Sequence, residues 1–344
     1  MATNPRPEAD YEVFSLGDVR LQSGAVLPDA RLAFKTYGRL NAAKDNVVVI
    51  PTYYTGKHNF NEPYFGPGKA LDPARHFIIS PDLFGNGLSS SPSNTAPPLD
   101  GPRFPRTTLH DNVACQHRLL SEVFGIERIA LVMGWSMAAL QSYQWAAQYP
   151  TMVANILPFC GSAKCSAHNF VFLDGVRVTL QADGAWACGD YDTPPEVGLR
   201  AFGRVYAGWA FSQTFYREGH YRTLGFETVE DLLVDWEEDH LNWDANDLLA
   251  MLWSWQHGDI SDNELYGGDL RRALGAIEAR VIVAPCSTDL YFPPEDNAIE
   301  VSMLRDAELR VFDSPFGHCV ATPGRHEDFV AFLDGAIRDL LDRG

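Results

Sequence analysis

The chain has 344 residues, a formal net charge of −18 at pH 7, a hydrophobic fraction of 46% and a mean hydropathy of −0.17. So negative a charge argues against nucleic acid as a partner and against anionic membrane surfaces, because phosphate binding needs clustered Lys and Arg. No apolar run is long enough to span a bilayer and none follows a basic start, so we expect a cytoplasmic protein without a secretory signal. This length can bury the core of one large α/β domain with an insertion, or of two domains.

The first half of the chain alternates strand-like and helical segments after a polar stretch, residues 1–10, that reads as a flexible tail. Apolar residues at helical spacing, with Thr107 or Thr108 as a cap, predict a helix over 108–124. The alternation predicts a mainly parallel sheet with helices on both faces. The expected strands are an antiparallel edge pair near 19–21 and 31–37, followed by 47–50, 76–80, 129–133 and 153–159.

A serine follows one of these strands in a pattern that indicates a tight strand-to-helix turn. Residues 131–139 read Leu-Val-Met-Gly-Trp-Ser-Met-Ala-Ala, with small residues, Gly134 and Ala138, two before and two after Ser136. Small residues are needed there because the strand and helix backbones pass very close. This is the sequence form of a nucleophile elbow, in which a strained, exposed serine sits at a helix N-terminus. The alternative is an ordinary buried strand followed by a helix.

From residue 163 to residue 275 the alternation stops, and the chain becomes helical and aromatic. Most of these aromatic side chains are expected in core packing or a subunit contact, and a few in shaping a substrate pocket. We therefore predict core residues 1–162, a helical cap over 163–275, and core residues 276–344, closed by a helix over 329–341. The cap holds six of the eight tryptophans: Trp186, Trp209, Trp236, Trp243, Trp253 and Trp255.

An aspartate and a histidine follow the last two candidate strands, 280–285 and 309–312. Asp289 comes just after the first strand and His318 after the second. In α/β-hydrolase chains the catalytic triad has the order Ser, then Asp or Glu, then His, each at a strand end. Other candidates fit less well, since they lie in polar helical sequence: His326, Asp296 and Asp306.

The chemistry requires such a set, because a serine hydroxyl is a poor nucleophile without a base within hydrogen-bond reach. His318 would take the proton of Ser136, and Asp289 would hold the imidazole in the required tautomer. An oxyanion hole should combine the Met137 N–H with one from the loop 51–56, where we favour Tyr54 over its neighbour Tyr53.

The chain has six cysteines, and their spacing matches no zinc or CxxC pattern. We expect no metal and no cofactor, and reduced thiols that mostly serve as small core residues. Cys286 and Cys319 are close in sequence to Asp289 and His318 and so are expected near the site.

Several motifs together resemble the homoserine O-acetyltransferase family of α/β-hydrolases over nearly the whole chain. The resemblance implies that Ser136, Asp289 and His318 are the triad, that residues 52–56 give the second oxyanion donor, and that the protein is a dimer through its cap. The matching segments are Gly66–Asp72, Gly134–Met137, Trp243–Asn246, Asp289–Glu295 and Ser314–His318.

The departures from this family concern the groups that hold homoserine. The transferases have an aspartate after the histidine for the amino group, where this chain has Cys319. They also have a cap arginine for the carboxylate, and our alignment puts Trp209 there. Losing both charges removes the charge-assisted contacts that a zwitterion needs. Together with Tyr53 and Trp135, these residues predict an apolar, aromatic alcohol pocket.

We therefore expect a serine carboxylesterase that hydrolyses small, short-acyl esters such as acetates through an acyl-serine intermediate. The alternative is an acetyl-CoA-dependent O-acetyltransferase that acts on homoserine or another alcohol. A third hypothesis, a non-catalytic ligand-binding member of the fold, is disfavoured by the complete triad.

Overall fold

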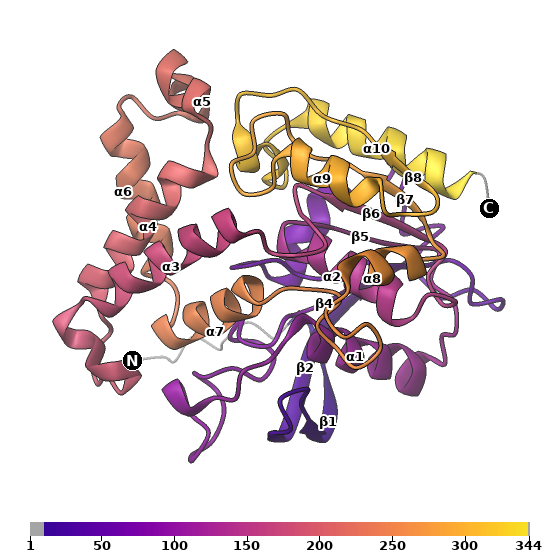
Figure 1. The fold of residues 1–344 in the computed structure, drawn as a ribbon, viewed down its shortest axis with the longest axis horizontal. Coiled ribbons are helices and arrows are strands. Elements are labelled where there is room, and N and C mark those ends of the chain that lie inside the picture. Colours follow the sequence, from indigo (N-terminus) through magenta and orange to yellow (C-terminus); the bar gives the residue numbers. More distant parts are fainter. Residues whose placement is uncertain (1–9, 343–344) are drawn as a thin grey trace, which may run out of the picture.

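A central eight-stranded sheet organises the molecule in the computed structural model, which describes residues 10–342 (Figure 1). The expected tail therefore lies outside the described residues, except for Asp10. The strands are β1 Glu12–Arg20, β2 Val26–Tyr37, β3 Val47–Val49, β4 Phe77–Pro81, β5 Leu131–Trp135, β6 Asn155–Phe159, β7 Arg280–Val283 and β8 Ala307–Leu309.

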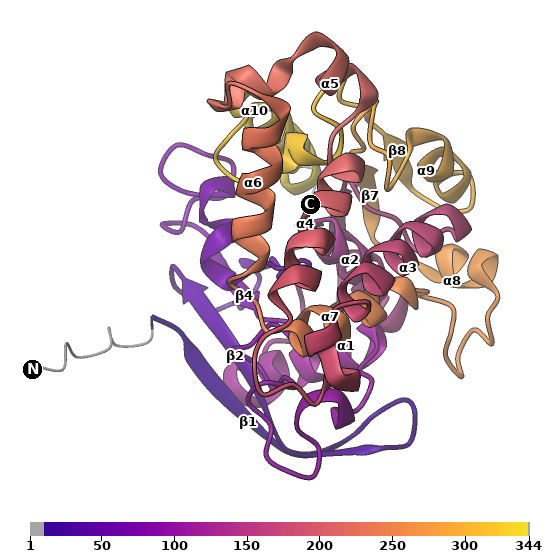
Figure 2. The same cartoon turned by 90° about the vertical axis from the view of Figure 1, so that its left-hand side faces the viewer.

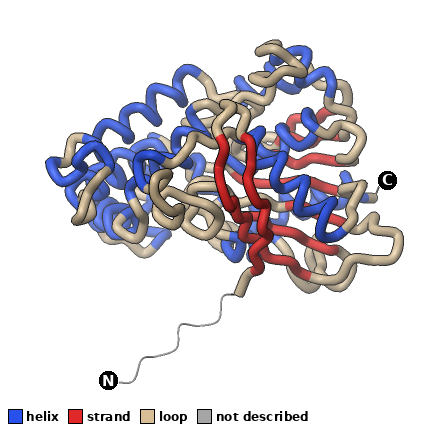
Figure 3. The backbone as a smooth tube through the Cα atoms, turned by 90° about the horizontal axis from the view of Figure 1, so that it is seen from below, coloured by secondary structure: helices blue, strands red, loops and turns tan. Residues whose placement is uncertain are grey.

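The sheet has the spatial order β1-β2-β4-β3-β5-β6-β7-β8. Within the described chain, β1–β2 and β2–β4 pair antiparallel, and every later pair is parallel. Figure 3 shows the long β1–β2 ribbon at one side of the sheet. The α/β-hydrolase fold with a mainly parallel sheet and an antiparallel edge pair is thereby confirmed.

Helices cover both faces of the sheet. Successive strand residues point to opposite sides, and in β5 and β6 the residues on both sides are buried, so each face needs a covering layer. Val132 belongs to a buried cluster with residues of α1, α2 and α8, whereas its neighbour Met133 packs in the cluster that contains α10. The helices are α1 Leu109–Arg118, α2 Met137–Gln148, α3 Ala167–Gln181, α4 Glu196–Ala210, α5 Gln213–Glu218, α6 Val229–His240, α7 Ala245–Gln256, α8 Leu270–Ala276, α9 Pro294–Val301 and α10 Glu327–Leu341.

Some element ends differ from expectation. The helix expected over 108–124 is α1, capped reciprocally by Thr108 and Asp111, and it continues as a π-helical turn, Leu119–Val123. The strand expected over 309–312 ends at Leu309, and Phe312 makes only an isolated parallel bridge to Cys286. The helix expectation therefore agrees with α1 and its π-helical continuation, whereas the strand was extended too far, because the apolar pattern runs past Leu309, the last residue that pairs with β7.

Helices α3 to α8 connect β6 to β7, and most of them gather on one side of the sheet (Figures 1 and 2). Arg204 of α4 ties α6 to this group through Glu230 at 2.7 Å and Glu237 at 2.6 Å. Helix α8 differs from the others, since its Ala273 and Leu274 join the buried cluster beneath α2. Among residues 10–342, no helix is both long and apolar enough to cross a membrane.

The closing helix α10 gives a direct test of the core. Phe329 is 1% exposed and packs edge-on against Phe312, with ring centroids 5.1 Å apart. Phe329→Ala should lower the free energy of unfolding by about 3–5 kcal/mol, through lost burial and an unfilled cavity. Urea denaturation measures this, with Arg338→Ala on the exposed face of α10 as a control expected within about 0.5 kcal/mol of wild type. A Phe329→Ala loss as small as that of the control would contradict this packing.

Candidate active site

The turn after β5 forces Ser136 into a conformation that few residues adopt. Ser136 has φ 57° and ψ −124°, and its side chain lies between the end of β5 and the start of α2. A Cβ atom added to Gly134 would lie 2.3 Å from the Ala138 Cβ, so strand and helix touch there. Gly161 is equally close to Ala139 on the other side. Such backbone strain persists only where the surrounding packing imposes it, and it concentrates at functional sites.

Asp289 and His318, which follow β7 and β8, meet in a buried pair. The His318 Nδ1 lies 2.8 Å from the Asp289 Oδ2, and the Asp289 side chain is fully buried. The second carboxylate oxygen accepts the backbone N–H groups of Tyr291 at 2.8 Å and Phe292 at 3.2 Å. Three hydrogen bonds therefore satisfy the carboxylate and direct the other imidazole nitrogen, Nε2, away from Asp289.

The imidazole lies beside the elbow. Trp135, the residue before Ser136, stacks on the His318 ring with centroids 5.1 Å apart. Within residues 10–342, neither Ser136 Oγ nor His318 Nε2 has a hydrogen bond to a protein group, so the two are not bonded to each other in this structure. Catalytic hydrogen bonds are often long in ligand-free enzymes and shorten when substrate is bound.

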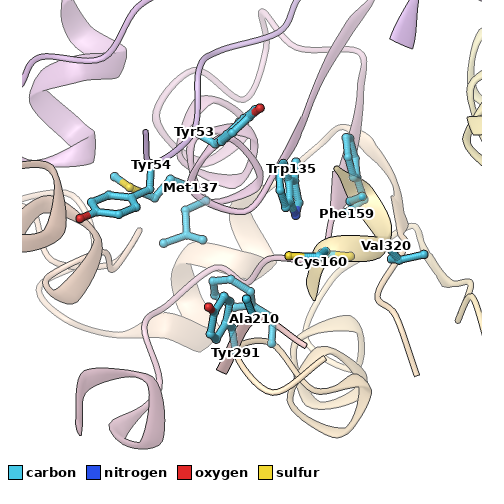
Figure 4. Close-up of a cluster of buried hydrophobic side chains, with 14 of the residues drawn as sticks. Tyr53, Tyr54, Trp135, Met137, Phe159, Cys160, Ala210, Tyr291 and Val320 are labelled. Atoms are coloured by element: carbon cyan, nitrogen blue, oxygen red, sulfur yellow. The ribbon is translucent and has the colours of Figure 1, made fainter. Parts of the chain in front are cut away.

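Two backbone N–H groups are available next to Ser136. Met137 is the first residue of α2, and Tyr54 lies in the buried loop after β3. Neither N–H bonds to an acceptor in the described part of the chain. Figure 4 shows Met137 and Tyr54 close together, with Trp135 and Tyr291 on other sides of the same cluster. The N–H of a helix N-terminus and of a loop is the donor pair that an oxyanion hole requires.

A cavity of about 970 Å³ opens beside this site. Tyr53, Trp135 and Cys319, three of the four expected pocket residues, line it. The fourth, Trp209, is not among its lining residues and packs instead on Phe172 and His168, each with ring centroids 5.0 Å apart. The alignment placed Trp209 by its chain neighbours, whereas its direction depends on how α4 packs on α3.

Around His318 the walls are aromatic. Tyr291 lies 4.5 Å and Phe292 5.6 Å from the imidazole, measured between ring centroids. Cys319 is buried, and burial raises the pKa of its thiol to about 12, so the thiol is uncharged at neutral pH. The position next to His318 therefore brings no charge to the site.

Several residues at the site carried no role in the sequence analysis. Tyr206 stacks on Tyr54 at 5.8 Å, and Phe172 stacks on Tyr291 at 4.8 Å. Tyr291 belongs to the run that follows Asp289, but nothing in the sequence showed that α4 and α3 would place Tyr206 against Tyr54 and Phe172 against Tyr291. Their burial is explained by helix packing that no local pattern reveals.

The residues described hold no cluster of three or more His, Cys, Asp or Glu side chains arranged to bind a metal ion.

Comparison with known proteins identifies the family of the chain. The α/beta hydrolase fold model matches residues 45–212. An ethyl acetate hydrolase of Pseudomonas veronii is 37% identical over 96% of this chain and 95% of its own. The chain belongs to the α/β-hydrolase family.

Two further relatives are a hydrolase and a transferase of the same fold. The crystal structure of an acetylester hydrolase from Corynebacterium glutamicum matches with a TM-score of 0.93 and 37% identity, over 96% of each chain. A homoserine O-acetyltransferase of Chlorobaculum parvum is 32% identical over 87% of this chain and 86% of its own. The resemblance seen in the motifs is thus confirmed, and these two hydrolases share a higher identity with the chain than this transferase does.

The tight elbow can be tested with one methyl group. Gly134→Ala should push α2 away from β5, since the added Cβ would lie 2.3 Å from Ala138, and should cost about 1–3 kcal/mol by overpacking together with most of the esterase activity. Gly175→Ala on α3 is the matched control, because its Cβ would meet nothing within 4 Å and alanine favours a helix by about 0.5–1 kcal/mol. Thermal unfolding and p-nitrophenyl acetate turnover measure both effects, and equal behaviour of the two variants would contradict the geometry.

Proposed function

We propose that this protein is a serine carboxylesterase that hydrolyses small, uncharged, short-acyl esters such as acetates of simple alcohols. The observation that carries this proposal is the buried Asp289–His318 pair beside the strained Ser136 elbow. The similarity to an ethyl acetate hydrolase and an acetylester hydrolase over almost the full chain supports it.

The geometry suggests how the reaction proceeds. Asp289 accepts the Nδ1 proton of His318, which leaves Nε2 as the base for Ser136 Oγ. Attack on the ester carbonyl forms a tetrahedral oxyanion, which the Met137 and Tyr54 N–H groups stabilise. The alcohol leaves with the proton from His318, and water activated by the same imidazole then hydrolyses the acyl-serine.

Two observations favour water over homoserine as the acceptor. The thiol of Cys319 is uncharged beside His318, so it cannot form an ion pair with an ammonium group. Trp209 packs in the cap and brings no positive charge to the site for a carboxylate. At these two positions a zwitterionic acceptor finds no ion-pair partner, so the charge-assisted contacts that the resemblance assigns to the transferases are missing. The charged residues that line the cavity occupy other positions: Lys57, Asp235, Glu238, Asp239 and Arg325.

We further propose a cytoplasmic homodimer that assembles through the helical segment 163–275, which acts as a cap on the core formed by 1–162 and 276–344. Exposed apolar side chains on two of its helices support such a contact: Phe170 and Val171 on α3, and Val197 on α4. Unpaired thiols throughout support a reducing compartment, since all six cysteines are free in the structure.

Removing the nucleophile is the first test. Ser136→Ala should lower kcat for p-nitrophenyl acetate by several orders of magnitude while circular dichroism and melting stay unchanged. Asp289→Asn and His318→Ala should also be severe, and the combined losses should not add, because the three groups act as a unit. Retention of more than a few per cent of activity in Ser136→Ala would place the nucleophile elsewhere. A fluorophosphonate probe should label the wild type and not this variant.

The acyl group supplies the second test. Each added methylene should lower the transition-state free energy by about 1 kcal/mol, and so raise kcat/KM, until the acyl pocket is filled, after which overpacking lowers kcat/KM. We expect the maximum at acetyl or propionyl esters and a steep fall beyond butyryl, measured with a p-nitrophenyl ester series at one pH. A maximum at octanoyl would indicate an open groove, and efficient acetyl transfer from acetyl-CoA to homoserine would refute the esterase in favour of the transferase.

A further inference from the structure

A glutamine in the core connects the two halves of the proposed oxyanion hole. Gln141 lies on α2, one turn after Met137, and its Nε2 donates to the Thr52 carbonyl at 2.8 Å and to the Met137 carbonyl at 3.3 Å. Thr52 lies two residues before Tyr54. One amide group therefore bonds both to the helix that carries the first N–H donor and to the loop that carries the second.

The neighbours of Gln141 hold its amide in one orientation. Its Oε1 accepts from Gln116 Nε2 at 2.7 Å, and Gln116 Oε1 accepts from Trp145 Nε1 at 2.8 Å. Gln141, Gln116, Trp145 and Thr52 are all fully buried. The Thr52 and Met137 carbonyls require the Nε2 end of the amide to face them, because a carbonyl cannot donate to the amide oxygen. The bond from Gln116 then satisfies Oε1, so the buried amide has no missing partner.

Thr52 is fixed on its other sides as well. Its N–H donates to the Pro81 carbonyl at 3.1 Å, and its hydroxyl accepts from the Leu83 N–H at 2.9 Å. On the opposite side of the loop, Tyr53 packs on Trp135 with ring centroids 4.6 Å apart. Two contacts therefore hold the loop against the elbow: the hydrogen bond from Gln141 to Thr52 and the ring contact between Tyr53 and Trp135.

We propose that Gln141 is a positioning residue that sets the separation between the Tyr54 and Met137 N–H groups and so determines how well they stabilise the oxyanion. The inference rests on the proposed esterase function. An oxyanion donor contributes only within a narrow distance of the developing charge, about 2.7–3.1 Å, so a shift of the loop weakens the transition state more than the ground state.

The test compares two variants of the same buried chain. Gln141→Met keeps the length of the side chain but leaves the Thr52 carbonyl without its donor. Gln116→Met is the matched control, because it removes a buried amide from the same network and leaves the bond from Gln141 to Thr52 possible. Removing a whole oxyanion donor costs about 10²–10³ in kcat, so displacing one in Gln141→Met should cost about 10–100-fold, with KM changed less than about threefold. Gln116→Met should lose stability and keep kcat within about threefold.

A tetrahedral mimic distinguishes positioning from general destabilisation. Ethylboronic acid, whose alkyl group matches that of a propionyl ester, forms an anionic adduct with a serine nucleophile, so its inhibition constant for Gln141→Met should rise in proportion to the fall in kcat/KM. A loss of kcat without weaker boronic acid binding would overturn the inference, as would equal kcat losses in the two methionine variants. If wild type neither hydrolyses esters nor reacts with fluorophosphonate, the proposed function itself fails and the inference with it.

Gln141→Glu gives a second readout that does not depend on how the methionine variant folds. An ionised carboxylate only accepts hydrogen bonds and would repel the Thr52 carbonyl, whereas a protonated carboxyl can donate to it. Burial raises the pKa of a carboxyl group, so the change should fall in the accessible pH range. The activity of Gln141→Glu relative to wild type at the same pH should therefore rise as the pH falls, and a ratio independent of pH would contradict the proposal.

Discussion

The close approach of β5 and α2 is the constraint on which the rest of the site depends. With hydrogen in place of a side chain at Gly134 and a methyl group at Ala138, the chain can reverse direction within a few residues. The reversal leaves Ser136 at a positive φ and exposes the first N–H groups of α2. The proposed nucleophile and the first proposed oxyanion donor are therefore products of the same backbone turn. Any rearrangement that relaxed the strain at Ser136 would also misplace Met137.

Burial strengthens the hydrogen bonds and electrostatic interactions of the polar groups around this turn. The Asp289 carboxylate has no exposed side-chain surface and receives three hydrogen bonds, so it stays aligned with His318 without competition from water. Aromatic rings enclose the imidazole, and electrostatic interactions are stronger in such low-polarity surroundings. The same aromatic enclosure of His318 disfavours a charged group that approaches the imidazole without an ion-pair partner.

The sequence allowed the sheet and the relative placement of Ser136, Asp289 and His318 to be predicted, because each follows a strand and parallel strands end at one edge. The observed 2.8 Å contact between Asp289 and His318 agrees with that reasoning. The direction of Trp209 was beyond it, since a helical residue turns with the packing of its helix. The contact of Gln141 was not predicted either. Its acceptor is the backbone carbonyl of a residue 89 positions away, and because every residue has such a carbonyl, the sequence does not show which one Gln141 bonds to.

The helices between β6 and β7 can change in evolution without disturbing the sheet. These two strands pair directly in the sheet, so the helices between them leave and re-enter the core at adjacent points. Ser136 lies before this excursion, and Asp289 and His318 lie after it. Insertions, deletions and repacking within α3 to α7 can therefore change the helices over this edge of the sheet without changing the register of the strands that position Ser136, Asp289 and His318. The helical segment and these strands are separable stretches of one chain, so selection can act on the first while the second is preserved.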